Sequence, residues 1–372
     1  MGEPLKSFFS PDLVRRLAAE ISRAHPPFPA DAFVEDATAG LTRLELLDRG
    51  KHIAAALARH LPPAYPDAIA VLLRSLGPAH ATDELIGAGM GPFFYLPHTV
   101  FVAERGLDHF EVSMHAQREL TRRFTAEFSI RPFLARDPER TVGVLREWAH
   151  DEDAHVRRLV SEGTRLRLPW AMRVPWLDRH PERVLELLEL LKDDPTSLVR
   201  RSVANSLNDL GKVHPARLFA TCGAWLEGAS PERRALVEHA LRSAIKRGEP
   251  GALRLLGYGK TPSISIEDVR FEPRRVAIGG RVALAFALRS TARSTQSLLV
   301  DLRVFFVKAN GTASPKVFKL ERVELPPGGR AELAKSISLA VHTTRTPRPG
   351  RHHVEVLVNG APLSLGWFDV RA

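Results

Sequence analysis

The stretch DEDAHVRRLV (151–160) recurs 43 residues later within DDPTSLVRRSV (193–203). Both copies contain the pattern Asp-x4-Val-Arg-Arg-x-Val, and LTRRFTAEF (120–128) is a third, less regular copy displaced by 35 residues. A period of about 40–47 residues is typical of HEAT-type repeats, in which each unit is a pair of α-helices. The repeat therefore predicts a solenoid of stacked helices, in which each unit contacts its neighbours.

The helical pattern extends over the first 260 residues or so. Apolar residues recur there at spacings of three and four, and Pro-Glu-Arg begins three of the amphipathic stretches, at 138, 181 and 231. Proline suits the first turn of a helix because its missing N–H would have no partner there. The spacing predicts roughly a dozen short helices.

The hydrophobic period changes to two after GYGKTPS (257–263). Seven candidate strands follow, separated by Gly-Gly, Asn-Gly and Pro-Pro-Gly-Gly turn signals. This number of short strands in about 110 residues is typical of an immunoglobulin-like sandwich. We therefore predict an all-α HEAT-like solenoid at 1–257, a linker at 258–263 and an all-β Ig-like sandwich at 264–372.

Composition narrows the possible functions. The chain is 44% hydrophobic and 26% charged, as expected of a globular protein, but its net charge is +10 and its pI is about 10.1. Such a charge favours an anionic partner, either nucleic acid or an anionic membrane surface, although a basic protein without such a partner remains the alternative. The half after residue 260 is the more basic, with 17 Lys and Arg against 9 Asp and Glu.

Several classes of site are disfavoured. The single cysteine, Cys222, excludes a disulfide framework and a cysteine-rich zinc site. The histidines show no metal-ligand spacing, and we interpret His352 and His353 as strand residues. No signal peptide or transmembrane run is recognisable, so we expect a cytoplasmic protein that is nucleoid-associated when bound to DNA.

Alignment of the repeats predicts a column of charged side chains. The second arginines of the three copies are Arg123, Arg158 and Arg201, and the residues four positions later are Glu127, Glu162 and Asn205. Residues four apart share a helix face, and one further turn leads from Asn205 to Asp209. The column predicts a basic groove that carries carboxylates. The alternative is that such Arg–Glu pairs only decorate a helix surface.

Other residues near the column have structural interpretations. We expect Asp151 and Asp194, at the head of two repeats, to pair with arginines of neighbouring repeats as scaffold. Trp148 is expected in the core, whereas Trp170 suits either a cap on that core or an aromatic face in the groove. In the basic half, the proline-rich loop at 342–353 carries three arginines that could reach a phosphate backbone or simply remain solvated: Arg345, Arg348 and Arg351.

Three blocks, at 120–134, 148–171 and 193–215, closely resemble the bacterial DNA alkylation repair glycosylases of the AlkC type. The resemblance covers most of 1–257, and some members carry a C-terminal Ig-like domain. It implies excision of cationic N3-alkylated bases, chiefly 3-methyladenine and 3-methylcytosine, from duplex DNA without flipping the base. It also implies that Glu127, Glu162, Trp170 and Asp209 match the acidic and aromatic positions of the active-site cleft, and that Arg158 lies near the DNA backbone.

The chemistry of such a substrate accounts for acids in a basic groove. A base that is already cationic leaves without protonation, and carboxylates stabilise the oxocarbenium-like sugar carbon that develops. We expect Asp209 to be the principal charge stabiliser or water activator, Glu162 and Glu127 to assist, and Trp170 to stack. Arg158, Arg123, Arg201 and Arg165 are then candidates for binding DNA.

These expectations require no metal, nucleotide or redox cofactor. We expect a monomer whose partner is duplex DNA, with no role at a membrane. Two alternatives remain at this point: a non-catalytic HEAT-repeat scaffold that binds a protein, and a DNA-binding repair accessory without catalysis.

Overall fold

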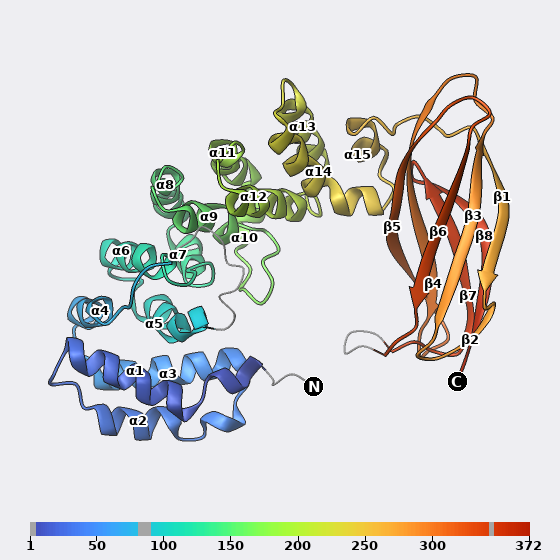
Figure 1. The fold of residues 1–372 in the computed structure, drawn as a ribbon. Coiled ribbons are helices and arrows are strands. Elements are labelled where there is room, and N and C mark those ends of the chain that lie inside the picture. Colours follow the sequence, from blue (N-terminus) through green and yellow to red (C-terminus); the bar gives the residue numbers. More distant parts are fainter. Residues whose placement is uncertain (1–4, 81–90, 342–345) are drawn as a thin grey trace. The chain divides into compact units, whose positions relative to one another are not determined.

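The computed structural model describes residues 5–80, 91–341 and 346–372. The chain forms two compact units (Figure 1). The first comprises the residues up to 218 together with 228–240, and the second comprises 219–227 together with 241–372.

The described residues contain fifteen α-helices and three short 3-10 helices, all before residue 256. The α-helices are α1 (Pro11–Ala24), α2 (Ala30–Thr38), α3 (Leu46–His60), α4 (Tyr65–Arg74), α5 (Leu96–Arg105), α6 (Phe110–Thr121), α7 (Ile130–Arg136), α8 (Pro138–Trp148), α9 (Ala154–Gly163), α10 (Pro175–Arg179), α11 (Pro181–Leu191), α12 (Ser197–Leu210), α13 (Pro215–Leu226), α14 (Pro231–Lys246) and α15 (Pro250–Leu255). The 3-10 helices are η1 (Leu5–Phe8), η2 (Leu41–Arg43) and η3 (Gly91–Tyr95). None of the described helices has the length and apolar character needed to cross a bilayer.

Local sequence signals begin these helices where they were expected. Ser10 accepts a hydrogen bond from the N–H of Leu13 at the start of α1, and Asp137 caps α8 in the same way. Asp153 accepts from the first free N–H groups of α9. These side chains satisfy donors that the helix itself leaves without partners. Trp148, at the end of α8, is buried as predicted.

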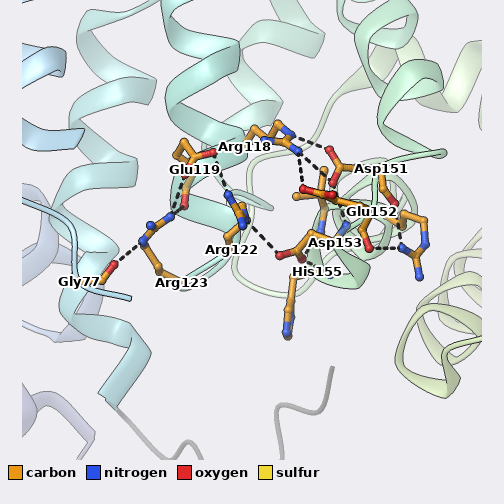
Figure 2. A network of polar contacts seen from close by, with 11 residues as sticks. Gly77, Arg118, Glu119, Arg122, Arg123, Asp151, Glu152, Asp153 and His155 are labelled. Carbon is orange, nitrogen blue, oxygen red and sulfur yellow. Dashed lines mark hydrogen bonds and ion pairs between the residues drawn. The ribbon is translucent and has the colours of Figure 1, made fainter. Parts of the chain in front are cut away.

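Ion pairs connect successive repeats. Arg118 of α6 bonds Asp151 at 2.6 Å, and Arg122 reaches Asp153 at 3.4 Å (Figure 2). One repeat later, Arg157 of α9 bonds Asp194 at 2.6 Å. The scaffold interpretation of Asp151 and Asp194 is therefore confirmed.

The first arginine of each Val-Arg-Arg also holds its own helix start. Arg157 donates to the carbonyl oxygens of Asp151 and Glu152, and Arg200 donates to those of Asp194 and Pro195. The same side-chain position thus closes the turn before α9 and before α12. This position is structural, which leaves the second arginine to face other groups.

The prediction that the copy at 120–128 is helical is wrong after its first two residues. Helix α6 ends at Thr121, and α7 begins at Ile130. In between, the hydroxyl of Thr125 accepts the backbone N–H of Glu127. This local bond competes with helix formation, so Arg123 and Glu127 lie in a connecting segment and not on a helix face.

The C-terminal strands form a β-sandwich. The strands are β1 (Ile264–Glu272), β2 (Arg275–Ala277), β3 (Arg281–Ser290), β4 (Gln296–Val307), β5 (Ala313–Leu325), β6 (Arg330–Ser338), β7 (Gly350–Val358) and β8 (Ala361–Arg371). One sheet has the order β1-β3-β6 and the other β2-β8-β7-β4-β5. Alternate apolar residues of both sheets form one core.

The seven predicted strands are present, and β2 is an addition. This strand has three residues and pairs in parallel with the edge of β8, so it is too short to show a period of two. His352 and His353 lie in β7 as predicted, with the His352 ring stacked on Phe368 in the core. Residues 258–263, between α15 and β1, contain no helix or strand.

Candidate functional site

A cavity of about 370 Å³ opens in the first unit, beside α9. Its wall is mostly apolar and aromatic, with two carboxylates and two guanidinium groups on one side. The lining residues are Leu47, Pro92, Phe93, Phe124, Thr125, Glu127, Phe128, Arg158, Glu162, Arg165, Leu168, Pro169 and Trp170. The volume lies within the range of about 300–1,000 Å³ that is usual for ligand sites.

Arg158 joins the two carboxylates of the cavity. Its Nη2 lies 3.1 Å from Oε2 of Glu127 and 3.6 Å from Oε2 of Glu162. Arg158 and Glu162 are four residues apart on α9, so they share a face, whereas Glu127 comes from the segment between α6 and α7. Thr125 donates to the same Glu127 oxygen at 3.0 Å. Arg158 is therefore a single cation that bridges Glu127 and Glu162, which belong to two successive repeats.

Arg165 extends the alternation of charges to the next repeat. Its Nη1 lies 2.5 Å from Oε1 of Glu162, and its Nε lies 2.8 Å from Oδ2 of Asp209 on α12. Lys212 binds the other Asp209 oxygen at 2.7 Å. The result is a ladder of alternating charge that runs Glu127, Arg158, Glu162, Arg165, Asp209 and Lys212.

Glu162 is the most constrained acid of the cavity wall. It is 5% exposed, and Ser202 of α12 donates to its Oε2 at 2.7 Å. Burial raises the pKa of Glu162, but the charges of Arg158 and Arg165 and the hydrogen bond from Ser202 outweigh it, so the pKa lies below its usual value. Burial lowers the pKa of Arg165, but the neighbouring Glu162 and Asp209 raise it by more, so this pKa lies above its usual value. The site therefore holds a carboxylate that is ionised at neutral pH.

A buried arginine positions the segment that follows α9. Arg131 of α7 donates to the backbone carbonyl oxygens of Gly163, Arg165 and Met172 at 2.7–3.0 Å. Burial lowers the pKa of Arg131 to about 10, so its guanidinium remains charged at neutral pH. Its three bonds fix the course of the chain on both sides of Trp170.

Trp170 lies at the rim of the cavity and is 68% exposed. Its φ is +63°, in the left-handed region that a bulky residue rarely adopts. Phe93 and Phe124, whose ring centroids are 5.1 Å apart, form another part of the wall. Aromatic faces beside the ionised carboxylate of Glu162 favour a cationic group in the cavity.

The structure brings together most of the predicted acidic and aromatic residues. Glu127, Glu162 and Trp170 line the cavity with Arg158 and Arg165, and Asp209 lies directly behind Arg165. Asp209 is 1% exposed, and both its oxygens are bonded. Of the predicted acids, Asp209 is thus the one that the present geometry keeps behind the wall.

The remaining predicted residues lie elsewhere. Arg123 is bonded to Glu119 and to the carbonyl of Gly77 (Figure 2). Arg201 lines a separate cleft between α12 and α14. In the second unit, Arg351 lies over the Trp367 ring and pairs with Asp369, and the Arg348 carbonyl bonds His352. Arg345 is outside the described residues.

Sequence reasoning missed the residues that support the acids. Ser202 stands directly after the Arg-Arg pair at 200–201, and Lys212 stands three residues after Asp209, so both could have been found from helix spacing. Arg131, Phe93 and Phe124 meet the site only through tertiary folding, and no spacing signals them. Across the described stretches, no group of three or more His, Cys, Asp or Glu side chains is placed to hold a metal ion.

Comparisons with known proteins agree with this architecture. The family described as DNA alkylation repair enzyme matches residues 124–248, and the C-terminal Ig-like domain of uncharacterised protein YhaZ matches residues 265–372. The chain is 32% identical over 357 residues to the uncharacterized protein YhaZ of Bacillus subtilis (strain 168), and the match covers 96% of each protein.

A solved structure extends the similarity to the whole chain. The alkylpurine DNA glycosylase AlkC of Pseudomonas fluorescens, bound to DNA containing an abasic site analog, matches with a TM-score of 0.90 and 36% identity, and 100% of both chains is covered. The fold, the two matched regions and the identity over nearly the full length point to one conclusion. This chain belongs to the DNA alkylation repair glycosylases of the AlkC type, which here carry a C-terminal Ig-like domain.

Proposed function

We propose that this protein is a DNA glycosylase that excises cationic N3-alkylated bases, 3-methyladenine and 3-methylcytosine, from duplex DNA in base excision repair. The observation that carries the proposal is the pair Glu127 and Glu162, which line one cavity beside aromatic side chains. Arg158 and Arg165 help to keep Glu162 ionised. A fixed negative charge in a mostly apolar wall matches a substrate whose positive charge moves from base to sugar during the reaction.

The reaction is a hydrolysis of the N-glycosidic bond. The bond between C1′ and the base nitrogen breaks, and its electron pair leaves with the base, whose positive charge is thereby neutralised. Water adds to C1′ and loses a proton to a carboxylate or to solvent. The products are the free base and an abasic site, and no oxidant or reductant takes part.

The carboxylates have graded roles in this proposal. Glu162 and Glu127 stabilise the oxocarbenium-like C1′ from the cavity wall, and a carboxylate orients the attacking water. Asp209 is the carboxylate that we expect to contribute most to stabilising C1′. For this role, its ion pair with Lys212 or Arg165 must open when DNA binds. Lys212 suits this exchange because its side chain is 43% exposed and can bind a phosphate in place of Asp209. Trp170 stacks at the rim.

DNA is the partner that the charge of the chain favours. The net charge of +10 attracts a polyanion, and the solved AlkC structure contains DNA. We propose that the base stays in the duplex, so that no unstacking energy is needed. Selectivity then comes from the lability of a cationic leaving group, and neutral damaged bases such as uracil or hypoxanthine should be released little. Arg348 and Arg351 of the second unit are candidates for further contacts with the phosphate backbone of DNA.

The test is base release from methylated duplex DNA by the parent, Glu162→Gln and Asp209→Asn. We expect the parent to free 3-methyladenine and each variant to lose about 10²–10³-fold in rate at unchanged DNA affinity, the usual loss when one charge-stabilising group is removed. If the parent binds DNA and frees no base, the protein is a non-catalytic accessory or scaffold. Robust release of uracil would contradict selection by leaving-group lability.

A further inference from the structure

A second cleft, of about 590 Å³, lies between α12 and α14 in the first unit. It is distinct from the cavity described above, with which it shares no lining residue. Its polar and charged lining residues are Ser197, Arg200, Arg201, Glu232 and His239. The first turns of two helices, at Ser197 and Pro231, contribute to the wall and add to its positive potential.

Arg201 is the charge in this cleft that lacks an anion. In α9 the residue four positions after the second arginine is Glu162, but in α12 it is Asn205, whose Oδ1 lies 3.2 Å from Nε2 of His239. No carboxylate within the described ranges pairs with Arg201, and its side chain is exposed. The exchange of glutamate for asparagine removes the carboxylate that could occupy this guanidinium.

The other charges of the cleft are already balanced. Arg200 is bonded to two backbone carbonyls, as described above. The backbone N–H of Glu232 and the side chain of Ser230 bond the Glu232 carboxylate and hold its pKa below the usual value, and the charge of Arg200 adds to the effect. Arg200 and Glu232 line the cleft with charges of opposite sign, so Arg201 provides the net positive charge of the cleft.

We propose that this cleft binds a backbone phosphate of the DNA strand beside the lesion, with Arg201 as its ligand. Helices α9 and α12 pack directly against each other, which places their axes about 8–10 Å apart. At about 3.4 Å per nucleotide along one strand, this distance corresponds to two or three nucleotides. The inference rests on the proposed function for the choice of DNA, but its test does not require base release.

The first experiment measures binding to a duplex that contains a tetrahydrofuran abasic-site analogue, which has no base to be released. The affinities of the parent, Arg201→Gln and a matched control, Arg105→Gln, are compared over a series of salt concentrations. Arg105, at the end of α5, is also exposed, and it lines neither cavity. We expect Arg201→Gln to lower the slope of log affinity against log salt by about 0.9, the value for one phosphate contact. Arg105→Gln should retain the parental slope, and Arg201→Lys should restore most of it.

The second experiment locates the phosphate. Single phosphates on either side of the analogue are replaced one at a time by neutral methylphosphonate, and binding is measured for the parent and Arg201→Gln. One position, two or three nucleotides from the analogue, should weaken the parent but not the variant. Equal slopes for parent and Arg201→Gln, or no such position, would overturn the proposal. If the slope of log affinity against log salt depends on Arg201 but the parent frees no base, the phosphate site in the cleft is supported and the glycosylase function is refuted.

Discussion

The repeats of α9 and α12 use the same Val-Arg-Arg sequence in two different ways. Their first arginines, Arg157 and Arg200, both bond the backbone carbonyls that precede their helix. Their second arginines differ, because the side chain of Arg158 is 15% exposed between Glu127 and Glu162, whereas Arg201 is exposed beside Asn205. A repeat can thus keep its scaffold residue and alter its functional residue through a change four positions away.

The largest effect expected from this comparison is the difference in stability between Arg158→Met and Arg201→Met. Arg158→Met leaves Glu127 and Glu162 without their shared cation, so we expect a loss of about 2–3 kcal/mol, less than the ~3–5 kcal/mol of a fully buried pair because Glu162 retains Arg165. Arg201→Met should change stability by less than about 0.5 kcal/mol. Thermal unfolding of the three proteins measures the difference, and equal losses would show that the two arginines are not distinct.

The pH dependence of stability sharpens the comparison of the same two variants. The pKa of Glu162 lies below its usual value of 4.5 in the folded protein, so its ion pairs stabilise the fold above that value and are lost as the pH falls through the folded pKa. The stability gap between Arg158→Met and Arg201→Met should therefore be full at neutral pH and shrink as acid protonates Glu162. A gap that already shrinks near neutral pH would show that Glu162 is not held ionised.

The residues of this comparison were predictable from the sequence to different degrees. The 43-residue displacement predicted both helices, the scaffold role of Asp151 and Asp194, and the alignment of Arg158 with Arg201. The third copy, displaced by 35 residues, added Glu127 to Glu162, and both acids contact Arg158; one further helical turn added Asp209, which contacts Arg165. The change of period near residue 260 likewise predicted the sandwich.

Tertiary contacts set the limit of that reasoning. Spacing could not show that Arg165 bridges Glu162 and Asp209, because its place depends on the carbonyl bonds from Arg131 on another helix. It also treated Arg158 and Arg201 as equals, although the residues four positions later, Glu162 and Asn205, already differ in charge, and only folding brings Glu127 to Arg158. The helix expected at Arg123 was wrong because the Thr125 side chain bonds a local N–H.

A smaller effect concerns the segments that follow the two helices. After α12 the chain continues through Gly211 at φ −64°, whereas the segment after α9 holds Trp170 at φ +63°. Such a conformation costs a bulky residue about 1–3 kcal/mol, and glycine adopts it freely. Trp170→Gly should therefore raise stability by about 1 kcal/mol while base release falls, and Trp170→Ala should lower base release without the gain in stability. A Trp170→Gly protein with parental stability would show that no strain is stored at the rim.

The smallest expected change in stability comes from making the two repeats alike. Asn205→Glu places a carboxylate four residues after Arg201, as Glu162 stands four residues after Arg158, and an exposed pair of this kind gains only about 0.3–0.5 kcal/mol. The new carboxylate should occupy Arg201 part of the time, so the salt dependence of DNA binding should fall in the same direction as in Arg201→Gln, but by less. Asn205→Gln, which has the length of glutamate without its charge, is the control and should bind as the parent does. If Asn205→Glu binds DNA with the parental slope, then Arg201 is not the cation that meets the phosphate, and the asparagine in this repeat has no bearing on binding.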